Sequence, residues 1–257
     1  MSYKDHYDTI MKTIMPPSFP VGIKLLRAGD DIPDTIPTPK KFGIAVYLCQ
    51  WIGMARRFGW VVGLTPDDIN CTPCLAGFGF KRVDDPSAIA SFYMDMGYFD
   101  SMEQARAMAE GSTSLEPGSV RGVLVFPLNK APVDPDVVVI YGTPAQMIRL
   151  TYAYISSFQK PIRSETTFGL SCLAAVKPSL TGDSTLIIPG RGERMMAGTD
   201  DAEMFFTVPA TQLDGIIDGL EKTHKKGLRF PIQGFGLFQP PVIPAMEKLG
   251  EHLVDVE

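Results

Sequence analysis

Hydrophobic and polar positions along the chain alternate between helical and strand-like spacing. Apolar residues three and four positions apart predict amphipathic helices over residues 3–14 and 212–224. Short runs of apolar and β-branched residues predict buried strands, because such side chains suit a pleated surface. These strands are expected at residues 21–27, 60–64, 120–128, 136–141, 185–188 and 204–208.

Further helices are expected between the strands. Residues 42–57 are apolar around nearly the whole circumference of a helix, which predicts a central buried helix. Proline just after a capping hydroxyl, as in Thr143-Pro144, is typical of a helix start. The remaining helices are expected at residues 86–110 in two pieces, after Thr143-Pro144, from Ser171 and from Met246.

The order of these elements predicts one α+β domain over residues 1–257, with a mixed sheet flanked by helices. The chain has no internal repeat and no low-complexity linker. A segment at about 226–245 is rich in proline, glycine and aromatic residues. We expect it to form an arm that packs on the body of the protein or on a second subunit, so a homo-oligomer stays open.

Composition narrows the class of protein. The formal net charge is -5, and no basic stripe is present, so we expect no nucleic-acid partner. No long uncharged apolar run is present, and charged residues interrupt the N-terminus, so we expect neither a membrane span nor a signal peptide. A cytoplasmic location is therefore the expectation.

The four cysteines are the strongest candidates for chemistry. Cys71 and Cys74 lie within Asn-Cys-Thr-Pro-Cys, whereas Cys49 and Cys172 are single and lie in apolar stretches. In a reducing compartment, such cysteines are more often metal ligands or redox thiols than a disulfide framework. We expect the fold to bring all four together around a [4Fe–4S] cluster, whose irons are held by thiolates.

The residues around Cys74 support this interpretation. Thr72-Pro73 is a helix-start signal, which places Cys74 in the first turn of a short helix. Backbone N–H groups in a first turn lack partners within the helix. They stabilise anions, including thiolates, and lower the pKa of a thiol.

Three alternatives compete with the cluster. A structural zinc site usually takes two short cysteine pairs, and this chain has one. A Cys-x-x-Cys dithiol that cycles through a disulfide is the second alternative, although residues 65–70 separate the pair from the preceding strand. The third is four unreactive cysteines, since a lone cysteine on an apolar face is often only a small core residue.

Candidates for substrate contacts are fewer. Arg191 and Arg194 lie in a glycine turn between two predicted strands, where two guanidinium groups suit a carboxylate or phosphate. The alternative is a solvated loop in which they pair with Asp200 and Asp201. Arg56, at the end of the predicted central helix, is a third candidate anchor.

Among other titratable residues, Glu165 is a candidate acid or base, with helix capping as the alternative role. The three histidines, His6, His224 and His252, lie near the termini or on a polar helix face, which favours solvated positions. No dinucleotide fingerprint or phosphate-binding loop is present.

Several ordered motifs resemble domain-of-unknown-function family 169, a family of bacteria and archaea, notably anaerobes. The resemblance spans roughly residues 20–222, and the family pattern places cysteines at Cys49, Cys71 and Cys172, with Cys74 less characteristic. Three ligands would leave one iron open as a Lewis acid, whereas four would favour electron transfer. The motifs are VGIKLL, Cys49 in the helix ending ARRFG, LTPDDINCTPCLAGFGF, DPDVVVIYGTPAQMIRL, Cys172 in a small-residue helix, and GRGERMMAGTDDAEMFFTVP.

The leading functional hypothesis is an iron–sulfur enzyme, an oxidoreductase or lyase, that acts on a small anionic substrate. A carrier that delivers electrons or a cluster to a redox partner protein is a different class. A ligand-binding module with a dithiol switch is the third.

Overall fold

The computed structural model describes residues 1–85, 87–111, 114–164, 166, 170–233 and 243–254. Within these residues the strands form one seven-stranded sheet in the order β2-β3-β1-β4-β7-β6-β5. Neighbouring strands are antiparallel except β5 and β6, which are parallel. The strands are β1 (Val21–Leu26), β2 (Val62–Leu64), β3 (Gly122–Pro127), β4 (Val137–Gly142), β5 (Arg163–Ser164), β6 (Thr185–Ile187) and β7 (Met204–Pro209).

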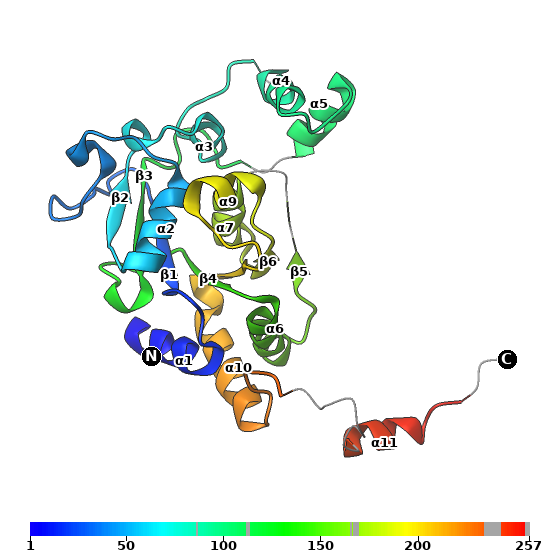
Figure 1. Ribbon diagram of the computed structural model, residues 1–257. Coiled ribbons are helices and arrows are strands. Elements are labelled where there is room, and N and C mark those ends of the chain that lie inside the picture. Colours follow the sequence, from blue (N-terminus) through cyan, green and yellow to red (C-terminus); the bar gives the residue numbers. More distant parts are fainter. Residues whose placement is uncertain (86, 112–113, 165, 167–169, 234–242, 255–257) are drawn as a thin grey trace.

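The sheet lies between two layers of helices (Figure 1). Successive side chains of a strand point to opposite faces, so β4 supplies both layers. Val137, Val139 and Tyr141 belong to the core shared with α2 and α7, whereas Val138 and Ile140 belong to the core shared with α1, α6 and α10. The predicted α+β class, with a mixed sheet flanked by helices, is confirmed.

The first layer contains α2 (Leu48–Phe58), α3 (Thr72–Gly77), α7 (Ser171–Val176), α8 (Pro178–Thr181) and α9 (Arg191–Ala197). Small residues let its helices approach closely. A Cβ at Gly77 would lie 3.2 Å from side-chain atoms of Leu170 and Leu173, so α3 sits directly against the start of α7. Likewise, a Cβ at Gly53 of α2 would lie 3.5 Å from a backbone oxygen of α9.

The second layer contains α1 (Tyr3–Ile14), α6 (Pro144–Phe158) and α10 (Leu213–Lys225). Here α6 and α10 pack with backbone close to backbone. A Cβ at Gly219 would lie 2.3 Å from the Ala153 carbonyl oxygen, so only glycine fits at this crossing.

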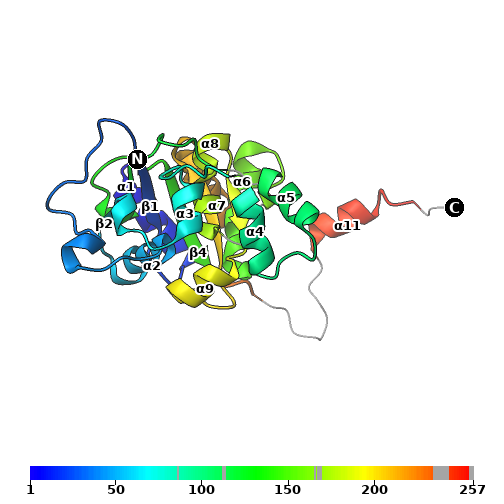
Figure 2. The ribbon, with the colours of Figure 1, turned by 90° about the horizontal axis from the view of Figure 1, so that it is seen from above.

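Of the helices in the described residues, three lie outside the two layers. α4 (Ser87–Asp95) and α5 (Met102–Gly111) pack on each other beyond α3 (Figure 1). α11 (Pro244–Gly250) stands away from the body in both views (Figure 1, Figure 2). Short 3-10 turns occupy Pro39–Phe42, Pro66–Asp68, Leu128–Lys130 and Ala210–Gln212. No helix in the described ranges is long and apolar enough to cross a bilayer.

The predicted helix at 42–57 begins later than expected. Gly43, with a φ of 69°, ends a 3-10 turn, and Val46 then pairs with the backbone of the segment after β2. The Val46 N–H donates to the Asp68 carbonyl at 2.8 Å, and the Asn70 N–H donates to the Val46 carbonyl at 2.9 Å. As a result, Cys49 lies in the first turn of α2 instead of its middle.

Two other segments differ from the sequence expectation or fall outside the described residues. The predicted glycine turn at 190–194 is the start of α9, with Gly190 as its N-cap. The predicted arm at about 226–245 includes residues 234–242, which lie outside the described residues.

Candidate functional site

The four cysteines lie at the starts of three helices of one layer. Cys49 is in the first turn of α2, and Cys71 is the N-cap of α3, which also carries Cys74. Cys172 is in the first turn of α7. All four are free thiols; Cys74 and Cys172 are buried in the core of this layer, and the other two are half-buried.

The thiols interact with one another. A side-chain hydrogen bond with Cys74, helped by the Cys74 backbone N–H, lowers the pKa of Cys71 to about 7 although burial acts in the opposite direction. Cys74 also has a side-chain hydrogen bond with Cys172. That contact, the contact with Cys71 and burial together raise the pKa of Cys74 well above its ordinary value.

Cys49 completes the group. Burial raises the pKa of the Cys49 thiol strongly, and the nearby Cys172, Glu193 and Cys71 raise it further. Each of the four cysteines therefore lies within interaction distance of at least one other. Four cysteines from three separate parts of the sequence thus form one group. We call Cys49, Cys71, Cys74 and Cys172 the cysteine cluster.

The donor set of this cluster suits an iron–sulfur group. Four thiolates are the ligands that such groups take, and in a [4Fe–4S] cluster each would bind a different iron. A site for a single metal ion has a stricter geometric requirement than a cluster site, because all its ligand atoms must converge on one point. Within the described ranges, no three His, Cys, Asp or Glu side chains are placed to hold a single ion.

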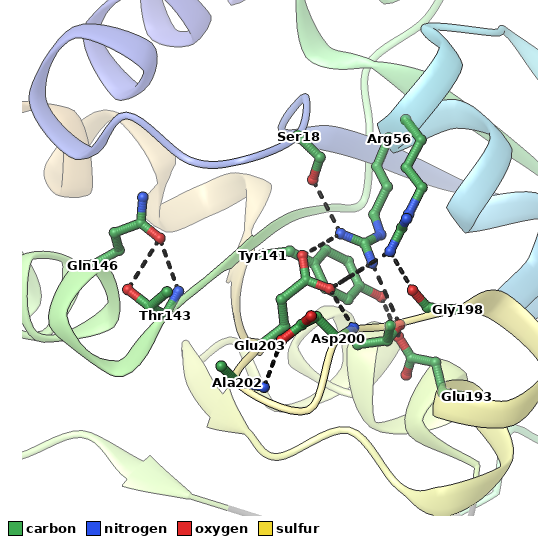
Figure 3. A network of polar contacts seen from close by, with 12 residues as sticks. Ser18, Arg56, Tyr141, Thr143, Gln146, Glu193, Gly198, Asp200, Ala202 and Glu203 are labelled. Carbon is green, nitrogen blue, oxygen red and sulfur yellow. Dashed lines mark hydrogen bonds and ion pairs between the residues drawn. The ribbon is translucent and has the colours of Figure 1, made fainter.

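Figure 3 shows a buried polar network that includes Glu193. Glu193 is close enough to Cys49 to raise the pKa of that thiol. The centre of the network is Arg56, which is 1% exposed and donates to both carboxylate oxygens of Glu203 at 2.7 and 2.9 Å. The Arg56 guanidinium lies 4.0 Å from the centre of the Tyr141 ring, a cation–π contact. It also donates to Ser18 at 3.1 Å and to Thr199 at 3.4 Å.

Glu193 joins this network to the cysteine cluster. Its Oε1 accepts hydrogen bonds from Tyr141 Oη at 2.8 Å and from Thr199 Oγ1 at 3.1 Å. Its carboxylate also interacts with the Ser171 hydroxyl, which precedes Cys172 and accepts from the Gly190 N–H at 2.8 Å. Burial raises the pKa of Glu193, and these hydrogen bonds offset that rise only in part.

The sequence was compared with family models, curated proteins and solved structures. A family model, DUF169, described as an uncharacterised ArCR family, matches residues 9–219. This chain belongs to that family. No curated protein and no solved structure matches it.

The expected family resemblance is thus confirmed, and the match extends beyond the predicted span at its N-terminal end. The DUF169 match contains all four cysteines, Arg56, Glu193 and Glu203. It ends within α10, before the segment that leads to α11. The cysteine cluster and the polar network therefore both lie in the DUF169 part of the chain.

The predicted substrate anchors lie in different surroundings in this DUF169 chain. Arg56 is buried, and its guanidinium is already paired with the carboxylate of Glu203 through two hydrogen bonds. Arg194 donates to three main-chain carbonyls, those of Pro189 at 3.1 Å, Glu203 at 3.2 Å and Asp200, so it ties α9 to the start of β7. Arg191 is exposed at the first residue of α9.

Glu165, the predicted acid or base, lies outside the described residues. Sequence reasoning missed Glu193, Glu203 and Tyr141. A signal was present, since an arginine in an apolar helix, such as Arg56, needs a carboxylate partner once it is buried.

Beside Arg56 the surface opens into a cavity of about 370 Å³. Arg57 and Asp200 contribute to its wall, together with Arg56 and Glu203. Arg57 is 42% exposed at the side chain and lies 3.8 Å from the Glu203 carboxylate. The two cations and two carboxylates lining the cavity balance in charge.

Proposed function

We propose that this chain is an iron–sulfur protein whose [4Fe–4S] cluster is held by Cys49, Cys71, Cys74 and Cys172. One observation carries the proposal: four free thiols from three separate elements interact with one another in an apolar part of the fold.

The protonation of the thiols supports the proposal. Thiolates are the ligands, so binding of the metal group must displace protons. Cys71, with a pKa of about 7, is already partly thiolate at neutral pH, whereas burial keeps Cys49 and Cys74 protonated. Loading would therefore release protons mainly from the buried thiols, and fewer from Cys71.

The proposed activity is that of an enzyme on a small anionic substrate. When bound, the cluster supplies electron transfer if all four cysteines are ligands, or a Lewis acid if Cys74 is not. Arg191, exposed at the start of α9, is the proposed anchor for the anion. Arg56 has a different task in this proposal, because its pairing with Glu203 fixes α2, which carries Cys49.

A cytoplasmic location is part of the same proposal. Free thiols persist in a reducing compartment. An electron carrier acting on a redox partner protein is the outcome expected if no substrate site accompanies the cluster.

Anaerobic purification, followed by a visible absorption spectrum and iron and sulfide analysis, tests the cluster. We expect a coloured protein with equal amounts of iron and sulfide. Cys172→Ser removes one ligand and should abolish or destabilise the cluster, whereas Ala174→Ser on the same helix should leave it intact. A colourless protein that contains no iron under these conditions would end the proposal.

Cys74→Ala then separates a cluster that acts as a Lewis acid from one that transfers electrons. With three protein ligands the cluster survives this change and keeps an iron open to substrate. With four, it becomes labile. Arg191→Gln, assayed by the spectral response of the cluster to added carboxylates, tests the anion anchor.

A dithiol function is the second candidate, and the pKa of Cys71 favours it. A thiol with a pKa of about 7 beside a buried partner thiol is suited to thiol–disulfide exchange. A partner disulfide would accept the two electrons and two protons that Cys71 and Cys74 lose as their disulfide forms. Trapping a mixed disulfide in Cys74→Ser, in protein shown to lack iron, would favour this function over the cluster.

A further inference from the structure

The cavity of about 370 Å³ beside Arg56 lies where four segments of the chain meet. Its wall is formed by the connection before β1, the end of α2, the start of α6 and the connection from α9 to β7. Figure 3 shows Ser18, Thr143 and Asp200, which contribute to this wall, around the Arg56–Glu203 pair. Small-molecule sites have volumes of about 300–1,000 Å³, so this cavity has room for a small ligand.

Two arginines in the last turn of α2 share one carboxylate at this wall. Arg56 donates to both Glu203 oxygens at 2.7 and 2.9 Å, whereas Arg57 Nη2 lies 3.8 Å from Glu203 Oε2. Arg57 Nη2 also donates to the Gly198 carbonyl at the end of α9, which holds its guanidinium at the cavity. Glu203 therefore neutralises Arg56, and the positive charge of Arg57 stays available to a ligand.

Asp200 supplies a negative charge to the same wall. It is exposed, and its Oδ1 accepts from the Ala202 N–H at 2.8 Å. Among the described residues its carboxylate pairs with neither Arg56 nor Arg57, which are both paired with Glu203. The side chain is thus oriented by one backbone hydrogen bond and keeps its second oxygen for a ligand.

The cavity therefore presents a cation and an anion that are not paired with each other. A guanidinium binds a carboxylate through two parallel N–H groups, and a carboxylate accepts charge-assisted hydrogen bonds from an ammonium group. A simple anion in the cavity would meet the negative charge of Asp200, and a simple cation would meet the positive charge of Arg57. A ligand that carries both charges satisfies both side chains.

Two hydroxyl groups add polar contacts. The Ser18 hydroxyl accepts from Arg56 Nη1 at 3.1 Å, which in the described part of the chain leaves its own hydrogen for a ligand. The Thr143 hydroxyl donates to Gln146 Oε1 at 3.2 Å, and its lone pairs can still accept. A ligand carboxylate can therefore receive a hydrogen bond from Ser18, and a ligand ammonium group can donate to Thr143.

We propose that this cavity binds a small zwitterion of the α-amino-acid class. We call it the Arg57–Asp200 site and define it as Ser18, Arg57, Thr143 and Asp200. The ligand carboxylate pairs with the Arg57 guanidinium, and the ligand ammonium group pairs with the Asp200 carboxylate. No cysteine lines the cavity, so the proposal is independent of the cysteine cluster.

Thermal unfolding of the full chain with each common L-amino acid other than cysteine tests the site. Ligands that bind the folded state raise the unfolding midpoint in a saturable way. Sodium acetate and methylammonium chloride, which each supply one of the two charges, serve as controls at equal ionic strength. We expect at least one amino acid to give a saturable rise in a concentration range where neither control does.

Substitutions locate the binding. Arg57→Gln removes the cation, and Asp200→Asn removes the anion but keeps the oxygen that accepts from Ala202. Each should weaken the apparent affinity for the amino acid about tenfold or more. Arg57→Lys restores the charge and should bind more tightly than Arg57→Gln. Asp201→Asn and Arg27→Gln change exposed charges outside the cavity and should leave the affinity unchanged.

The substituted side chains are exposed, and the midpoint of each variant without amino acid reports whether it folds. Three results would overturn the proposal. The first is that no amino acid gives a saturable rise with the native protein. The second is a rise that stays unchanged in Arg57→Gln and in Asp200→Asn. The third is an equal rise with acetate or with methylammonium, which would assign a ligand of single charge instead.

Discussion

The Arg56–Glu203 pair gives the sharpest test of how the first helix layer is held together. Arg56→Met keeps the length and apolar stem of the side chain but removes the guanidinium. Glu203 then keeps the Asp200 N–H at 2.9 Å and the distant Arg57 at 3.8 Å, and it loses both short hydrogen bonds from Arg56. The carboxylate, with a side chain only 9% exposed, becomes a buried charge without its main partner.

Removing one partner of a buried ion pair costs about 3–5 kcal/mol. For a chain of this size, each kcal/mol lowers the unfolding midpoint by about 2–4 °C, so the variant should unfold about 6–20 °C below the native protein. Replacing both partners, as in Arg56→Met with Glu203→Met, should recover most of this loss, because no unpaired charge remains. Arg57→Met removes an exposed cation and should cost less than about 1 kcal/mol.

Urea unfolding followed by circular dichroism measures these four proteins and the single variant Glu203→Met, which completes a double-mutant cycle and gives the coupling between Arg56 and Glu203. A loss under about 1 kcal/mol for Arg56→Met, or a double variant no better than the single, would refute the proposed cost of an unpaired Glu203.

The same pair predicts a pH dependence. Burial alone would raise the pKa of Glu203, but hydrogen bonds from Arg56 and from the Asp200 N–H lower it below its ordinary value of 4.5. The stability that the pair contributes is therefore complete above about pH 4.5 and is lost as the pH falls through the lowered value. The difference between the native protein and Arg56→Met should shrink in acid.

Three further predictions concern separate parts of the molecule. Cys71 should react with iodoacetamide before the other cysteines, and its rate should rise with a midpoint at about pH 7. Cys74→Ala should move this midpoint up toward pH 9, which peptide mapping over a pH series would show. Gly219→Ala should destabilise the protein by about 1–3 kcal/mol in urea, because its Cβ meets the backbone of α6, whereas Gly250→Ala, with nothing near, should not. Asp183 has a pKa of about 2, because hydrogen bonds from Lys160, Tyr154 and Gln212 outweigh the effect of burial. It therefore stabilises the fold fully above about pH 4 and loses this effect toward pH 2. Asp183→Asn should remove this loss of stability in acid, as urea unfolding over a pH series would show, and an unchanged pH profile would contradict the prediction.

Much of the fold could be predicted from local patterns. The strands come from apolar runs whose burial depends little on their partners, and all the predicted runs are strands. Helix α2 shows the limit of this approach. Residues 43–46 are as apolar as the helix that follows, and only their pairing with residues 68–70 shows that they are extended.

The functional residues show a similar division. Cysteine is rare and its spacing is informative, so a cluster could be suggested before its members were seen together. Glu193 and Glu203 are ordinary acidic residues in a polar segment, and their burial follows from contacts with distant Tyr141 and Arg56. Arg149 is a charged residue in the middle of α6, and nothing local in the sequence shows that it is buried against Thr223 of α10.

Strand β4 has neighbours on both sides and a helix layer on each face. Val139 pairs with Val21 of β1 and with Thr207 of β7, and its neighbours in sequence face the opposite core. Inserting or deleting one residue here would send Tyr141 to the wrong side and carry away the stacking surface for Arg56. Homologues should therefore differ in length only in the connecting loops, and strand β4 should keep the same length in all of them.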